Sequence, residues 1–207
     1  MSPDTAAPPR PGPGRPSTGA RERILAAGLE TLLADGYAGL TTAKVAVRAG
    51  ESKALIAYHF GSKQGLVGAA ARELGELITS EVLDALGEAT TVEQIVTGTV
   101  EGVWRILDRD VRLARSYFDL NAVSVVEESV RAVLREVKDR WREVLSGFLR
   151  DAGVPRRRIP PATVFLFAGV EGLSLERVER GATAEIEEAR RMFERAAIAA
   201  IGARSAR

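Results

Sequence analysis

The sequence predicts an all-α protein. Six of its nine prolines fall within the first 17 residues, and none lies between Thr18 and Val154. Because proline breaks a helix from within, this long proline-free stretch permits continuous helices. Apolar residues recur along it at helical spacing, and no segment alternates apolar and polar residues as a half-buried strand would. Capping residues, such as Thr91 followed by Gln94, stand where helices are expected to begin.

The first predicted helix covers about residues 18–35. Its apolar residues are spaced as one face of an amphipathic helix and comprise Ile24, Leu25, Leu29, Leu32 and Leu33. Gly36 predicts the end of this helix, because glycine readily adopts the left-handed conformation that closes helices. Tyr37 follows directly.

Two short helical patterns joined through a glycine follow, between Leu40 and Leu66. Thr41 or Thr42 can cap the first helix, and Gly50 supplies the left-handed turn residue. Ser52 can cap the second helix, which ends near Phe60. This is the outline of a helix-turn-helix, a motif whose second helix enters the major groove of DNA.

The second of these helices carries a mixed polar face. Leu55, Ile56 and Phe60 can turn toward a core, whereas the other side mixes donors, acceptors and positive charge over Ser52, Lys53, Tyr58, His59 and Lys63. Such a face suits phosphates and base edges. From these residues alone, a small buried helix with a solvated polar side is an equally good interpretation. His59 has no neighbouring metal ligands, so we interpret it as a hydrogen-bonding or packing residue.

Four helical patterns follow the helix-turn-helix. Ser62 can cap a long helix to about residue 86, and Thr91 with Gln94 forms a capping box for the next, to about residue 107. Residues 109–121 form a short helix. The clearest apolar period in the chain spans residues 125–150, and the Gly153-Val154-Pro155 sequence ends it.

The last two helices are predicted over residues 162–180 and from Thr183 onward. Pro160 and Pro161 stand where a first helical turn accepts proline. Both helices expose small and apolar residues, namely Val164, Ala168, Gly172 and Leu175 on one and Ile186, Ala189, Phe193, Ala196, Ala197 and Ala200 on the other. These faces are either buried within the monomer or form a four-helix seam between two copies, which a two-fold reader of DNA needs.

The order of motifs resembles the DNA-binding domain of the TetR family of bacterial repressors over about residues 14–70. Along the chain stand Gly14-Arg15-Pro16, one helix, Gly36-Tyr37, Thr41-Thr42, the helix-turn-helix, and a final stretch that reads Tyr58-His59-Phe60-Gly61-Ser62-Lys63. Two positions depart from the family pattern. Glu51 stands where members commonly have an apolar residue, and Ala57 stands where many have tyrosine.

The resemblance implies that Tyr58 and Lys63 approach the DNA backbone. We expect residues 1–17 to be a disordered proline-rich arm, with Arg15 as its candidate contact to the minor groove or backbone. The complete set of candidate DNA-contacting residues is Arg15, Thr41, Thr42, Lys44, Ser52, Lys53, Ala54, Ile56, Tyr58, His59 and Lys63.

The resemblance also implies a ligand cavity between the fourth and eighth helices. Most large aromatic residues follow the DNA-binding part, and each is individually more often core than ligand contact. Polar groups within such a cavity would orient an apolar ligand. The candidate ligand-binding residues are Trp104, Tyr117, Phe118, Asn121, Trp141, Phe148, Phe167 and Glu171.

Composition places further bounds on function. The net charge of +1 is modest for a nucleic-acid-binding protein, although residues 1–65 hold eight Lys or Arg against five Asp or Glu. The chain has no Cys, which excludes disulfides and thiol catalysis. There is no signal peptide and no apolar stretch of about 20 residues, so we expect a cytoplasmic protein without a membrane partner. No phosphate loop, metal-ligand spacing or catalytic motif is present, so we expect no catalytic residues, no metal and no cofactor.

Together these observations predict three segments: a disordered arm (1–17), a TetR-type helix-turn-helix domain (18–65), and a ligand-binding and dimerisation domain (66–207). The predicted function is a homodimeric transcriptional repressor that binds a palindromic DNA operator and is released by a small apolar or amphipathic inducer. The alternatives are a helical scaffold that does not bind DNA and a cofactor-free enzyme.

Overall fold

The computed structural model describes residues 19–202, which form nine α-helices and one short 3-10 turn without any strand. The predicted all-α fold class is therefore confirmed. The helices are α1 (Ala20–Gly39), α2 (Thr42–Ala49), α3 (Lys53–Phe60), α4 (Lys63–Leu86), α5 (Val92–Arg109), α6 (Val111–Ser124), α7 (Glu128–Asp151), α8 (Ile159–Arg180) and α9 (Ala184–Gly202), with the 3-10 turn at Arg156–Arg158.

Local signals in the sequence predicted most helix ends. Ser62 caps α4, and Thr91 and Gln94 form the predicted capping box at the start of α5. Gly36 has a φ of 67° and interrupts α1, so that residues 37–39 form one extra turn after the main helix. α7 begins at Glu128, later than residue 125, because a turn at Val125 and Val126 separates it from α6.

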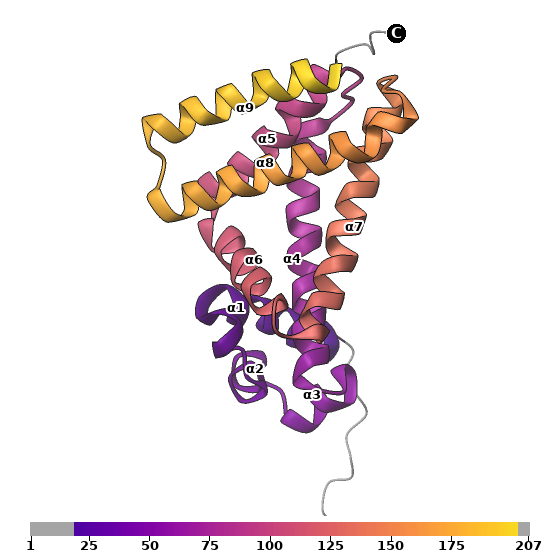
Figure 1. Cartoon of the computed structure of the whole chain (residues 1–207). Helices are drawn as coiled ribbons and strands as arrows, with labels where there is room; N and C mark the ends of the chain where they lie inside the picture. Colours follow the sequence, from indigo (N-terminus) through magenta and orange to yellow (C-terminus); the bar gives the residue numbers. More distant parts are fainter. Residues whose placement is uncertain (1–18, 203–207) are drawn as a thin grey trace, which may run out of the picture.

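The helices form a small head and a larger body, which α4 joins (Figure 1). α1, α2 and α3 lie together at one end, and α8 and α9 lie side by side at the opposite end. α4 runs from the head into the body, where α5, α6 and α7 surround it. Of the helices in residues 19–202, none is both long and apolar enough to cross a membrane.

Two apolar cores hold these helices. The first joins the head to the body, because Ile24 of α1 and Leu66 of α4 are buried together with Leu120 of α6 and Leu134 of α7. The second lies among α5, α7, α8 and α9. Phe118 of α6 packs against both cores, so α6 lies at the boundary between them.

Candidate DNA interface, ligand cavity and dimer face

The α2–turn–α3 unit is built by two side-chain caps and one glycine. The backbone N–H of Lys44 donates to Thr41 Oγ1 at 3.2 Å, and the N–H of Leu55 donates to Ser52 Oγ at 3.1 Å. Gly50 between the helices has a φ of 66°, the left-handed conformation expected of it. Thr42 is the first residue of α2. The predicted roles of Thr41, Gly50 and Ser52 in shaping this unit are confirmed.

The turn also explains one departure from the family pattern. Glu51 pairs with Arg23 of α1, with Arg23 Nη2 2.5 Å from Glu51 Oε1. A charged residue can follow the turn glycine because this ion pair supplies a partner for the carboxylate. The pair links the turn to α1 in the place where an apolar contact would otherwise do so.

The outer face of α3 presents Lys53, Ala54, Ala57 and Tyr58 to solvent, with 72% of Tyr58 exposed. The structure therefore brings most of the predicted α3 residues together on one exposed face. Ile56 is different, because it is 1% exposed and belongs to the core that joins head and body. The prediction that Ile56 contacts DNA is wrong, since its position on α3 turns it toward α1 and α4.

Two predicted lysines flank this face. Lys44 of α2 is exposed and its Nζ lies 3.2 Å from Asp35 Oδ2. Lys63 at the start of α4 places its ammonium 5.1 Å from the centre of the Tyr37 ring. Val47 of α2 is 85% exposed, and the sequence analysis did not select it because an apolar residue gave no signal of binding.

His59 is partly buried among aromatic rings. Its imidazole lies edge-on to Tyr58 and Phe60, with ring centres 5.1 and 6.4 Å away. Its Nε2 is buried and has no hydrogen-bond partner among the described residues. Of the two roles predicted for His59, packing is the one these contacts support. Arg15 and the rest of the predicted arm lie outside the described residues.

A cavity of about 120 Å³ lies in the body between α4, α5, α6, α7 and α8. Five of the candidate ligand-binding residues line it, namely Tyr117, Phe118, Trp141, Phe167 and Glu171. Aliphatic side chains such as Ile78, Val103 and Val170 supply most of the remaining wall. The arrangement is that of a small apolar site with a few polar groups.

Glu171 is the acidic group of this cavity. Tyr117 Oη donates a hydrogen bond to Glu171 Oε1, and Lys138 Nζ lies 3.0 Å from the same oxygen. Burial, together with the adjacent Glu171 carboxylate, raises the pKa of Tyr117 well above its ordinary value. Tyr117 therefore stays protonated and holds the carboxylate at the cavity wall.

Three predicted ligand contacts lie elsewhere. Asn121 Nδ2 donates to the backbone carbonyl of Tyr117 at 2.9 Å, outside the cavity wall. Phe148 packs into the second core. Trp104 faces α9, because its position on α5 is rotated away from the cavity. None of the three lines this cavity, since periodicity identifies an apolar face but not which neighbour that face meets.

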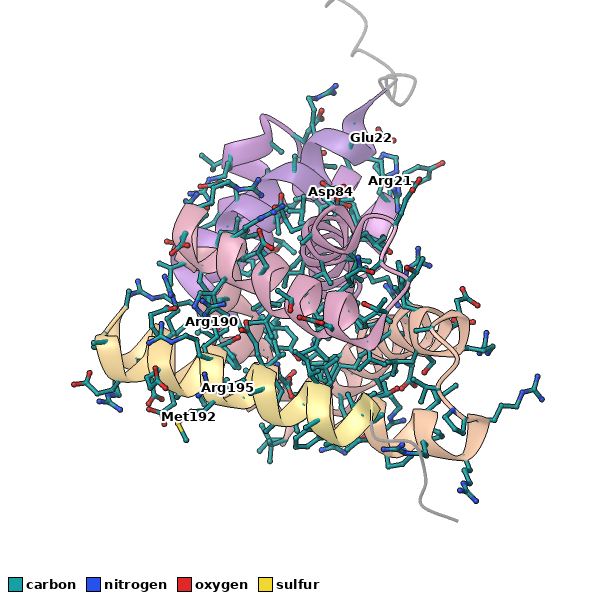
Figure 2. The ribbon with its side chains drawn as sticks, turned by 90° about the horizontal axis from the view of Figure 1, so that it is seen from above. Arg21, Glu22, Asp84, Arg190, Met192 and Arg195 are labelled. Carbon is teal, nitrogen blue, oxygen red and sulfur yellow. The ribbon has the colours of Figure 1, made fainter. Side chains whose placement is uncertain are left out.

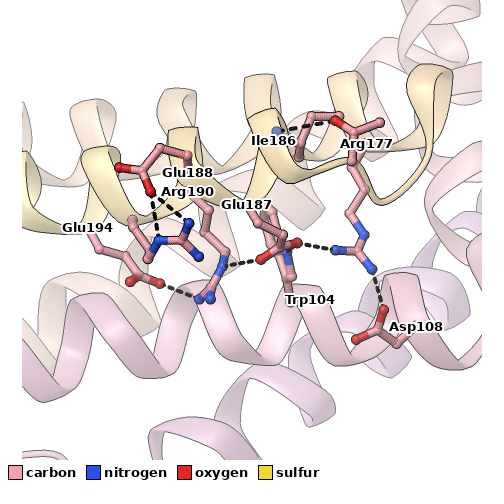
Figure 3. Close-up of polar contacts among 10 residues, drawn as sticks. Trp104, Asp108, Arg177, Ile186, Glu187, Glu188, Arg190 and Glu194 are labelled. Carbon is pink, nitrogen blue, oxygen red and sulfur yellow. Dashed lines mark hydrogen bonds and ion pairs between the residues drawn. The ribbon is translucent and has the colours of Figure 1, made fainter.

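Trp104 belongs to a charged cluster that joins α5, α8 and α9 (Figure 3). Its Nε1 donates to Glu187 Oε1 at 2.8 Å, and the guanidinium groups of Arg177 and Arg190 lie 5.5 and 5.8 Å from its ring. Burial alone raises the pKa of Glu187, but hydrogen bonds from Trp104 and Arg190 outweigh it and leave the pKa below its ordinary value. The cluster fixes α9 to the body.

The head is held against α6 and α7 by hydrogen bonds that sequence reasoning missed. Ser116 Oγ donates to the carbonyl of Leu32 at 3.2 Å, and the backbone N–H of Tyr37 donates to Asp119 Oδ2 at 2.6 Å. Tyr37 Oη donates to Glu127 Oε2 at 2.5 Å. Gly36 could have predicted a backbone break with free N–H groups, but nothing in the sequence pointed to acceptors more than 80 residues away.

Residues 24–70 match the family model described as bacterial regulatory proteins, tetR family. Residues 24–70 therefore carry a TetR-type DNA-binding domain. A solved candidate TetR-family transcriptional regulator from Rhodococcus sp. is 27% identical, with a TM-score of 0.75 over 89% of this chain and 98% of that one. No curated protein matches the sequence.

Other solved structures share the fold. The multidrug binding protein EbrR complexed with imidazole is 22% identical, with a TM-score of 0.70 over 94% of this chain and 96% of its own. A candidate transcriptional regulator from Saccharomonospora viridis in complex with choline is 20% identical, with a TM-score of 0.68 over 85% and 94% of the two chains. At these identities the likeness shows the fold.

α8 and α9 expose an apolar face at the end of the body away from the head. Val164 is 60% exposed, and Ala168, Gly172 and Leu175 are exposed on the same helix. Met192 lies on the outer side of α9, whereas Arg190 turns toward the body (Figure 2). On α9, Ala196 and Ala200 are exposed, and Ala189 and Phe193 are partly buried.

Two residues predicted for this face are in the core. Ile186 is 3% exposed and Ala197 is fully buried, both against the second core. Their assignment to an intermolecular face is wrong, because α9 turns them toward α5 and α8. Phe165 and Met192 are exposed and were not predicted, since the sequence alone leaves the rotation of a helix about its axis undetermined.

Proposed function

We propose that this chain is a ligand-responsive repressor of the TetR family that binds a palindromic operator as a homodimer. The observation that carries this proposal is the double role of α6. Tyr117 and Phe118 of α6 line the cavity, while Ser116 and Asp119 of the same helix hold α1. A molecule in the cavity therefore touches the helix that supports the head.

The head, residues 18–65, is proposed to read DNA through α3. The exposed face of Lys53, Ala54 and Tyr58 suits the major groove, because it combines a positive charge and a phenol hydroxyl with a small side chain that permits close approach. The Lys53 ammonium and the groups around this face are proposed to position the helix on phosphates; those groups are Thr41, Thr42, Lys44, Ser52, His59, Lys63 and Arg15.

The body, residues 66–207, is proposed to bind ligand and to dimerise through the exposed faces of α8 and α9. A two-fold dimer presents two copies of α3 to two half-sites, which accounts for a palindromic operator. Small molecules bound to two proteins of this fold, imidazole in EbrR and choline in the Saccharomonospora viridis protein, support a ligand site in the body.

Release is proposed to follow from movement of α6. A ligand that occupies the cavity better when α6 is displaced shifts the dimer to a state in which the two heads no longer match their half-sites. A hundredfold change in operator affinity requires a ligand that prefers that state by about 2.7 kcal/mol. Contacts between α6 and α1 carry this difference to α3.

The proposal is tested by fluorescence anisotropy with labelled DNA from upstream of the gene and with a scrambled duplex. Specific binding only to the upstream DNA is expected, and equal affinity for both duplexes would exclude the repressor. A compound that raises the melting temperature of the protein is then added, and operator affinity should fall.

Coupling through α6 is tested by Asp119→Ala, with Asp151→Ala as a control on an exposed carboxylate of α7. The Asp119 variant should keep the rise in melting temperature and lose much of the release, because its α6 no longer holds the N–H of Tyr37. If release is as large as in the wild type, the signal travels by another route.

A further inference from the structure

The polar groups that line the cavity direct their hydrogens into the protein. Thr99 Oγ1 donates to the carbonyl of Ile95 and Ser174 Oγ to that of Val170, each at 2.7 Å. Thr79 Oγ1 donates to the carbonyl of Gly75 at 2.7 Å and accepts from Trp141 Nε1 at 2.6 Å. Each of these donors is therefore occupied before any ligand enters.

Glu171 is the remaining polar side chain of the wall, and its carboxylate is an acceptor. Tyr117 Oη donates its hydrogen to Glu171 Oε1, and Lys138 Nζ lies 3.0 Å from the same oxygen. The second oxygen, Oε2, keeps lone pairs that can accept from a ligand. Thr99 and Ser174 likewise keep lone pairs after donating. Among the described residues that line the cavity, the polar groups that keep unused hydrogen-bonding capacity are thus acceptors, and none is an uncommitted donor.

Because the polar groups of the wall can accept but not donate further hydrogen bonds, the cavity is expected to distinguish ligands by their own polar group. An alcohol or amine that enters can donate to Glu171 or Ser174 and so replaces the hydrogen bond that it loses to water. A carboxylate or ketone finds no donor and leaves its acceptor buried and unpaired. The Lys138 ammonium already pairs with Glu171 and lies 5.5 and 6.0 Å from the centres of the Tyr117 and Phe167 rings, and Lys138 is not among the residues that line the cavity.

The size of the cavity limits the apolar part of the ligand. Its volume of about 120 Å³ is close to the roughly 150 Å³ of a protein cavity that accommodates benzene. Four aromatic side chains, Tyr117, Phe118, Trp141 and Phe167, contribute to the wall. A single ring or a short branched chain fills such a space.

We propose that the cavity binds a small apolar molecule, about one ring in size, whose polar group is a hydrogen-bond donor, and that it selects against carboxylates. The proposal rests on the proposed function in that this molecule is the inducer, but the selectivity can be measured as binding alone.

The test uses isothermal titration calorimetry of the full-length protein near neutral pH with four probes of one shape: benzyl alcohol, benzylamine, toluene and benzoate. Benzyl alcohol or benzylamine should bind at least about tenfold more tightly than benzoate, because benzoate buries unpaired acceptors. Toluene should lie between them, since it neither gains nor loses a hydrogen bond. Benzoate that binds as tightly as the alcohol and the amine overturns the proposal.

Glu171→Gln tests the acceptor directly, because the amide introduces an N–H donor at nearly the same shape. The preference for benzyl alcohol over benzoate should shrink about tenfold, and Glu179→Gln, exposed on the same helix, should leave it unchanged. An unchanged preference in Glu171→Gln contradicts the assignment. Ser174→Ala, which removes a second acceptor and should also reduce the preference, serves if the Glu171→Gln variant does not fold.

The same titrations separate this proposal from the proposed function when operator release is measured in parallel. If benzoate binds most tightly and releases the operator, the proposed preference for hydrogen-bond donors (the donor rule) is wrong, and the proposal of a ligand-responsive repressor is retained. If none of the four probes binds, the cavity is not a site for molecules of this size, and both the donor rule and the assignment of the inducer to this cavity fail.

Discussion

At the scale of single residues, Lys53 is the clearest charged group on the proposed reading face. It is the first residue of α3 and is exposed beside Ala54 and Tyr58. In a major-groove complex its ammonium would meet phosphates, where a contact contributes affinity without sequence preference.

Lys53→Ala should therefore weaken binding to every operator variant by a similar factor. The slope of log affinity against log salt concentration should become shallower by about 0.9, the value for one lost phosphate contact. Arg105→Ala, exposed on α5, should leave the slope unchanged. A slope that does not differ from that of the wild type would place Lys53 away from the phosphates.

Tyr37 makes the second residue-scale prediction, which concerns alkaline pH. Burial, the hydrogen bond to Glu127 and the charge of that carboxylate raise the pKa of Tyr37 to about 12. The folded protein thus holds the phenol proton more tightly than the unfolded chain, which releases it near its ordinary pKa of 10.0. The resulting stabilisation is complete below about pH 10 and is lost as the pH rises through 12.

Urea unfolding of wild type and Tyr37→Phe at a series of pH values measures this effect. The variant should be less stable near neutral pH by about 1 kcal/mol, the typical value of one hydrogen bond. The difference between the two proteins should shrink as the pH passes 10. Tyr58→Phe, which alters an exposed phenol, should show no such convergence. A difference independent of pH would mean that Glu127 does not hold the Tyr37 proton.

At the scale of elements, the Trp104 cluster decides how α9 is attached. Trp104→Phe keeps the ring between Arg177 and Arg190 but removes the hydrogen bond to Glu187. A loss of about 1 to 2 kcal/mol in the free energy of unfolding is expected, because the acceptor is charged. Binding of cavity ligands should be unchanged, since Trp104 does not line the cavity. If ligand binding weakens and stability does not fall, Trp104 contacts the ligand after all and does not mainly attach α9.

Helix starts and ends were predictable because their signals are local. A serine or threonine caps the helix that begins beside it, and Gly36 or Gly50 determines its own backbone conformation. The packing partners of helix faces could not be predicted from the sequence, because they depend on how each helix is rotated about its axis in the folded molecule. Trp104 and Ala197 both lie in the second core, yet Trp104 also donates a hydrogen bond to a charged cluster, which its apolar pattern does not reveal.

The same difference between local signals and long-range packing determines which residues of the candidate sites could be predicted. The exposed face of α3 was found because capping and charge fix its position along the chain. In the cavity, Tyr117 and Glu171 were identified from resemblance to a family, not from their spacing. Asp119 and Glu127 were missed because their partners lie in a distant helix, and a solvated surface carboxylate has the same appearance in a sequence.

At the scale of the whole molecule, the proposed dimer depends on the exposed face of α8. Val164→Asp should leave the monomer folded, because Val164 is 60% exposed, but should dissociate the dimer, because an unpaired charge in a packed seam costs several kcal/mol. Analytical ultracentrifugation should then show monomers with wild-type helix content, and operator binding should be lost.

Ala197→Asp provides the contrast. Ala197 is fully buried against the second core, so a charge there should unfold the protein and not only separate two chains. Glu93→Gln, an exposed change on α5, should affect neither assembly nor folding. An intact Val164→Asp dimer would move the seam to another surface.

The core shared by head and body limits how this protein can be recombined with its relatives. Leu120 of α6 and Leu134 of α7 complete the core that also buries Ile24 and Ile56 of the head. A head cut after residue 65 leaves these side chains uncovered, so the reading unit is not an exchangeable module at that boundary. A chimera with a new operator specificity should transplant only the exposed residues of α3, or should carry the facing sides of α6 and α7 along with the head.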